Sequence, residues 1–194
     1  MKKILIATLV ATSALVAAPA AAQTATGTLN ITGSVGAKCQ VVDAGGAASG
    51  NFASTVALGE LSQSNGLLRT DVASSFNAAG AAALNFRVVC TGATPAVSVD
   101  ATEITAATTA AAGYANRIDY NATATFTLVG GTQAVSNDSA INATATTGAL
   151  TSRLAGAGTN VAITASNFRT PALTDVLVAD PTYTGKIVVV VSPT

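Results

Sequence analysis

The chain has 194 residues with nine basic and nine acidic side chains, no histidine and no tryptophan, and only 9% of its residues are charged. Without histidine the usual general base, metal ligand and catalytic-triad member are all missing, so we expect no enzyme, no cofactor and no metal site. Glycosidase chemistry needs only two carboxylates, but the acidic residues here are isolated and most lie near turn residues. The charges form no basic stripe, which argues against a nucleic-acid partner. Eight scattered aromatic residues do not form the interfacial girdles of a membrane-embedded protein.

Residues 1–22 are typical of a secretory signal peptide. Lys2 and Lys3 precede an apolar run, and small residues end it at Ala22. A membrane anchor is the alternative, but the apolar run is short and Pro19 suits a processing site better than a buried helix end. We therefore expect export and a mature chain from Gln23, whose 172 residues suit one domain.

The mature chain opens with an alternating stretch, "TATGTLNITGSVGAKC", from Thr24 to Cys39. One face is rich in hydroxyl groups, and the other is apolar or small. The apolar face consists of Ala25, Gly27, Leu29, Ile31, Gly33, Val35 and Ala37. This period of two predicts a half-buried β-strand. This stretch would show the same alternation whether it pairs with its own domain or with a neighbouring molecule.

Strand signals continue along the chain, with threonine, valine and isoleucine in short runs and Gly, Asn, Asp and Pro between them. The predicted strands cover residues 39–42, 54–61, 82–90, 95–101, 121–130, 159–168 and 183–191. Residues 102–115 are rich in alanine, but their repeated threonines favour a loop or ragged strand over a helix. Short strands at regular spacing predict a single all-β sandwich.

The two cysteines, Cys39 and Cys90, are the only ones in the chain. In an exported protein such a pair predicts one disulfide. The loop it closes is long, and the chain-entropy model gives a stabilisation of about 4 kcal/mol. A redox-active role is disfavoured because no C-x-x-C arrangement is present.

The last predicted strand, Tyr183–Val191, is apolar on both faces. Ile187, Val189 and Val191 alternate with Val188 and Val190. Such a run suits a central strand covered on both sides, and it equally suits a sheet edge that awaits a partner.

Taken in order, several of these pieces resemble the spore coat U family, which includes the Csu-type pilins of archaic chaperone–usher pili. The resemblance rests on "TGTLNITGSVGAKCQV", which leads a threonine-rich strand into a cysteine, on "LGEL", on "LNFRVVCTGATPAVSV" and on the terminal "YTGKIVVVVSPT". The resemblance lies in the order of these pieces along most of the mature chain. Residues 102–160 match it poorly.

The resemblance implies an incomplete immunoglobulin-like β-sandwich that is completed by a donor strand from a neighbouring subunit. Residues 23–37 would be the donor segment and residues 38–194 the pilin domain. The donor anchors would be Ala25, Gly27, Leu29, Ile31, Gly33 and Val35. The acceptor groove would be bordered by Ile187, Val189 and Val191.

The expected function is therefore that of a structural subunit, a major or minor pilin, of a surface pilus that supports adhesion and biofilm formation. Its expected partners are identical or related pilins, a periplasmic chaperone and an outer-membrane usher. The chain would pass through the periplasm to the cell surface. The alternative is a monomeric secreted or periplasmic β-sandwich that binds a ligand.

Overall fold

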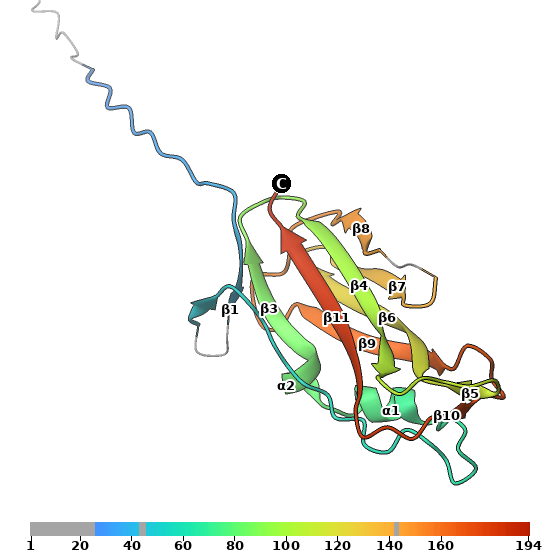
Figure 1. Cartoon of the computed structure of the whole chain (residues 1–194). Helices are drawn as coiled ribbons and strands as arrows, with labels where there is room; N and C mark the ends of the chain where they lie inside the picture. The colour runs from blue at the N-terminus through green and yellow to red at the C-terminus, as the bar shows by residue number, and fades with distance from the viewer. Residues whose placement is uncertain (1–25, 43–45, 142–143) are drawn as a thin grey trace, which may run out of the picture. The chain divides into compact units, whose positions relative to one another are not determined.

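The computed structural model describes residues 26–42, 46–141 and 144–194, and β-strands dominate this part of the chain (Figure 1). Within these described residues, two short helices, α1 (Val72–Asn77) and α2 (Ala81–Leu84), interrupt the strands. The all-β prediction is confirmed. The predicted signal peptide and Ala25 lie outside the described residues.

The strands form one nine-stranded sheet and one small parallel pair. They are β1 (Cys39–Val42), β2 (Ala48–Ser49), β3 (Asn85–Cys90), β4 (Ala96–Ala106), β5 (Tyr114–Ala115), β6 (Arg117–Leu128), β7 (Gly131–Asp138), β8 (Thr146–Ala149), β9 (Val161–Arg169), β10 (Val176–Leu177) and β11 (Tyr183–Ser192). The order in the large sheet is β11-β4-β6-β9-β3-β1-β2, with β7 also beside β6 and β8 also beside β4. The strands β5 and β10 pair in parallel.

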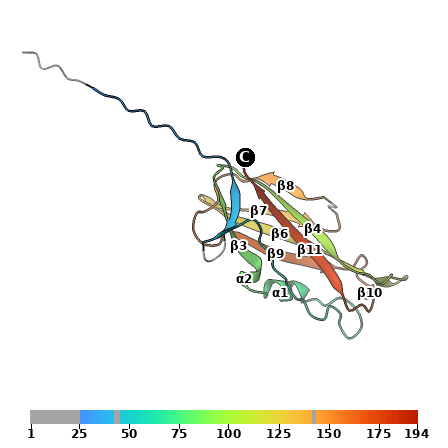
Figure 2. The same cartoon turned by 60° about the vertical axis from the view of Figure 1, so that its left-hand side comes forward.

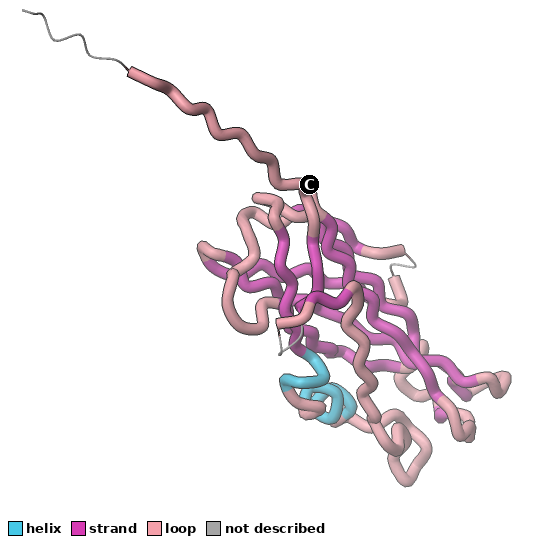
Figure 3. Tube along the Cα trace, turned by 90° about the vertical axis from the view of Figure 1, so that its left-hand side faces the viewer, coloured by secondary structure: helices cyan, strands magenta, loops and turns pink. Residues whose placement is uncertain are grey.

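The large sheet folds over on itself because β4 and β6 pair only at Ile104 and Thr105 of β4. One layer contains β11, β4 and β8, and the other contains β7, β6, β9, β3 and β1. Val99 of β4 and Phe126 of β6 belong to the same buried core, and both are fully buried. Figure 3 shows the two helices together at one end of the strands.

The alternation in the sequence explains this core. Along β6, the side chains of Ala122, Ala124 and Phe126 are buried, while the threonines between them are half-buried. Because successive side chains of a strand point to opposite faces, this pattern places one row in the core. Ile104 and Ala106 continue the row in β4, so this strand extends beyond the predicted end at residue 101 into the threonine-rich stretch.

The pairing of β11 with β4 contains a bulge, in which Glu103 and Ile104 of β4 lie opposite the single residue Gly185. The register against β4 shifts between Thr184 and Lys186. A Cβ atom built on Gly185 would lie 2.6 Å from Cγ1 of Ile104 and 3.1 Å from its Cα. Only glycine allows this close approach of the two strands.

Several predicted strands are confirmed, and others differ from the structure. The predictions for residues 39–42, 159–168 and 183–191 match β1, β9 and β11, while the front part of 82–90 is α2 instead. Residues 54–61 form no strand, although Val56 and Leu58 turn inward at the expected spacing. The strands β7 and β8 were not predicted.

The predicted disulfide is confirmed. Cys39 and Cys90 are bonded and lie opposite each other in the β1–β3 register. Next to them, the backbone N–H of Lys38 donates to the Thr91 hydroxyl, and this hydroxyl donates to the Gly36 carbonyl. The chain therefore enters the sandwich at a fixed point beside β3.

Candidate functional site: an apolar groove beside the last strand

A long groove runs along β11 over the whole strand. Its volume is about 1560 Å³. Apolar side chains from several strands and from α1 and α2 form its floor: Phe76, Leu84, Phe86, Val88, Ile104, Ile163 and Phe168. The groove therefore reaches into the core of the sandwich and opens to solvent.

The first wall of the groove is β11, which lies at the end of the sheet. Within the described residues β11 pairs only with β4, so its other edge carries backbone groups without a strand partner. The side chains of Ile187, Val189 and Val191 all line the groove and pack against the core. Val190 also borders the groove, but it does not pack against the core and is 47% exposed.

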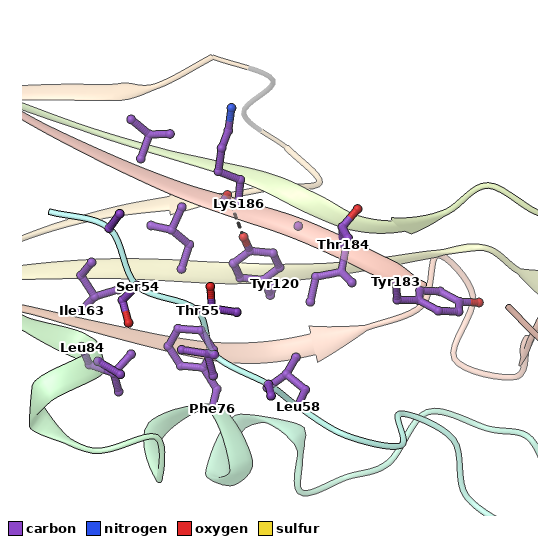
Figure 4. Close-up of a pocket in the computed structure, with 18 of the residues that line it drawn as sticks. Ser54, Thr55, Leu58, Phe76, Leu84, Tyr120, Ile163, Tyr183, Thr184 and Lys186 are labelled. Atoms are coloured by element: carbon purple, nitrogen blue, oxygen red, sulfur yellow. Dashed lines mark hydrogen bonds between the residues drawn. The ribbon is translucent and has the colours of Figure 1, made fainter. Parts of the chain in front are cut away.

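The second wall is the segment Gly50–Ser62, which lines the groove from end to end without forming a strand. It is held by side chains: the ring of Phe52 stacks on Phe86 with centroids 4.6 Å apart. In Figure 4, Ser54, Thr55 and Leu58 of this segment lie on one side of the groove and Lys186 of β11 lies on the other. Both walls are thus long runs of backbone along one groove.

Tyr120 is buried beneath β11 and shows how the floor is held. Its hydroxyl lies 3.0 Å from the carbonyl oxygens of both Thr102 and Lys186, and it donates to one of them at a time (Figure 4). Its ring stacks on Phe168. Burial raises the pKa of Tyr120 far above its ordinary value, so the hydroxyl stays a donor at every physiological pH.

Charged groups occupy only the rim of the groove. The carboxylate of Asp180 accepts hydrogen bonds from Thr108 and Thr182, and these bonds lower its pKa. Among residues 26–42, 46–141 and 144–194, no three His, Cys, Asp or Glu side chains gather as a metal site would require. The groove therefore offers burial of apolar side chains and backbone hydrogen bonding.

The predicted donor anchors lie outside any strand. Residues 26–38 are exposed and form no strand, so the strand predicted over 24–39 is wrong for residues 26–38 of the single chain, and only Cys39 belongs to a strand. The side chains of Leu29, Ile31 and Val35 are 86%, 89% and 80% exposed. Gly27 and Gly33 are exposed as well, and Ala25 lies outside the described residues. The alternating pattern of residues 26–38 is therefore present without a neighbouring strand that pairs with their backbone.

Sequence reasoning missed the second wall and the floor. Residues 54–61 alternate as a strand would, and this was the only signal for the wall. Tyr120 and Phe168 carried no signal at all, because a single aromatic residue in a strand is typical of any core.

The described part of the chain contains no helix long and apolar enough to span a lipid bilayer. No family model, curated protein or solved structure matches this chain.

Proposed function

We propose that this protein is a structural subunit of a chaperone–usher surface pilus and that it polymerises by donor-strand exchange. The observation that carries the proposal is the apolar groove that opens beside the unpaired edge of β11. The occupant is the N-terminal segment of a second copy. Before assembly, a periplasmic chaperone fills the groove with a strand of its own, and the usher exchanges it at the outer membrane.

The segment and the groove agree in length and chemistry. The strand β11 has ten residues, and the segment before Gly36 offers ten described residues, 26–35. Its apolar positions alternate, as does the row Ile187, Val189 and Val191 in the groove wall. An extended chain rises about 3.3 Å per residue, so the two runs can lie alongside each other over their full length.

The energies favour a fixed register. Burying the exposed side chains of Leu29, Ile31 and Val35 contributes about 1.5–3 kcal/mol each. Each backbone hydrogen bond to β11 adds about 0.5–1.5 kcal/mol, against an ordering cost of about 1–2 kcal/mol per residue. A slip by one residue would bury threonines in place of the three apolar side chains. The apolar side chains therefore decide both affinity and register.

The incomplete immunoglobulin-like sandwich follows from the same proposal. The inserted strand would lie between β11 and the segment Gly50–Ser62 and would complete the fold in the assembled fibre. One sandwich in the mature chain suits the shaft or an adaptor position of a pilus that supports adhesion and biofilm formation.

The test is the state of the purified mature chain on a denaturing gel. Unheated samples should give a ladder of polymers that collapses to monomer after boiling. Deletion of Gln23–Val35 should remove the ladder and leave a folded subunit bound to its chaperone. A single band in both conditions would refute the proposal and favour a monomeric ligand-binding protein.

A further inference from the structure

The charges of the sandwich divide between its two ends. One end holds the C-terminal end of β11, the turn between β6 and β7, and the point where the chain enters the sandwich at Gly36. Figures 1 and 2 show the C-terminus at this end, beside β8 and away from β5 and β10. We name it the basic end, for the cations Lys38, Arg87 and Arg153.

Two of the three cations of the basic end bind backbone carbonyl groups. Arg153 donates to the carbonyl oxygen of Thr91, and Arg87 donates to that of Gly156. None of them is in an ion pair with a described carboxylate. Lys38 is exposed. Asp43 follows β1 in the sequence and lies outside the described residues, and with its charge counted here three cations still outnumber one carboxylate.

The opposite end holds the start of β11, the strands β5 and β10, and the loop between residues 62 and 69, which meets β10 through a hydrogen bond from Leu177 to Gly66. We name it the acidic end, for seven carboxylates: Glu60, Asp71, Glu103, Asp119, Asp138, Asp175 and Asp180. Its three arginines are all bound in ion pairs to three of these carboxylates. With the exposed Lys186 also included, a net negative charge remains. Asp100 lies halfway along β4 and belongs to neither end.

We infer that the basic end of one copy docks on the acidic end of the next, and that this contact orients the donor segment. This inference rests on the proposed function. The segment leaves the sandwich at the basic end, where Thr91 holds Gly36 and Lys38. The groove runs from Asp180 and Tyr183 at the acidic end to Val191 at the basic end.

The charges select one of two directions of insertion. If the segment ran parallel to β11, the basic end of the donor copy would lie against the basic end of the acceptor, and like charges would repel. A segment antiparallel to β11 places its residue 35, and with it the basic end of its own copy, at the acidic end of the acceptor, so opposite charges meet. It also leaves the basic end of each acceptor free for the next contact, so the chain of copies can grow without limit.

Complementary charges act mainly on the rate of association. Attraction between charged surfaces raises association rates by about 10- to 1000-fold at low ionic strength, and salt screens it. The donor segment itself, residues 24–35, carries no charged side chain. Charge screening therefore has little effect on its binding to the groove, which separates the groove from the end-to-end contact.

The experiment measures the assembly rate of the full mature chain by light scattering at low and high ionic strength. Lys38→Glu reverses a charge at the basic end, and Asp175→Lys reverses one at the acidic end. Each should slow assembly about tenfold at low salt. The double variant should recover most of the wild-type rate. Asp100→Lys is the control, since it makes the same change in net charge as Asp175→Lys but lies away from both ends.

A second readout uses a fluorescent peptide of residues 24–35, measured by anisotropy at subunit concentrations too low for assembly. Equal peptide binding to wild type and Asp175→Lys, together with slowed assembly that the double variant reverses, would support the inference. If wild type assembles and binds the peptide but neither salt nor the variants change the rate, the inference is overturned and the proposed function stands. If wild type neither assembles nor binds the peptide, both are overturned.

Discussion

The apolar side chains of the N-terminal segment should determine how tightly it binds the groove. Ile31 is 89% exposed in the single chain, so its burial in a second copy would remove nearly the whole side chain from water. Replacing it with alanine removes three carbon atoms, at about 0.8 kcal/mol for each. The loss of about 2.4 kcal/mol corresponds to a binding constant about fiftyfold weaker.

The assay compares fluorescent peptides of residues 24–35 that carry Ile31→Ala or Thr32→Ala, binding to the mature chain. Thr32 lies on the opposite face of the segment, so its truncation should weaken binding less than fivefold. Leu29→Ala should behave as Ile31→Ala does. Equal losses for Ile31→Ala and Thr32→Ala would show that the segment does not bind as a strand with one apolar face in the groove.

Four further outcomes are expected from the structure. Val189→Asp places a charge on the groove face of β11 and should abolish the polymer ladder, whereas Val190→Asp, on the exposed face, should leave it intact. Gly185→Ala should lower the free energy of unfolding in urea by about 1–3 kcal/mol because its Cβ would overlap Ile104, whereas Gly148→Ala has open space and should change it little. Reduction of the disulfide should cost about 4 kcal/mol in the same measurement, and an unchanged urea midpoint would contradict this. Burial raises the pKa of Asp119 in the folded state, so the stability linked to its proton is present below about pH 4 and is lost as the pH rises through the raised value. Asp119→Asn should therefore lose less stability than wild type as the pH rises above about 4, as measured by urea unfolding at each pH.

Much of the all-β body could be predicted because its strands carry their own signal. In β6 and β9 small or apolar residues alternate with threonine, serine and asparagine, and the pattern depends only on which face meets the core. The disulfide could be predicted from two cysteines in an exported chain. These are local features of the sequence, and the structure bears them out.

The groove was harder to predict because it lies where β11 has no second strand beside it among the described residues. Residues 54–61 and 24–38 both alternate as strands would, but residues 54–61 and 26–38 form no strand in the single chain. A periodic pattern reports which face is apolar, and it contains no information about which backbone supplies the hydrogen bonds. The helix α1 carried no signal either, since its six residues include no acidic side chain in the first turn and no basic one in the last.

Hydrogen exchange along β11 tests the proposed assembly most directly. In the antiparallel pair with β4, every second amide of β11 points to the free edge, where water reaches it. Addition of the peptide of residues 24–35 should slow exchange at these alternate amides by at least about a hundredfold, while the amides bonded to β4 change little. Unchanged exchange along β11 with the peptide bound, or full protection of the free edge before it is added, would contradict insertion of a strand from another copy.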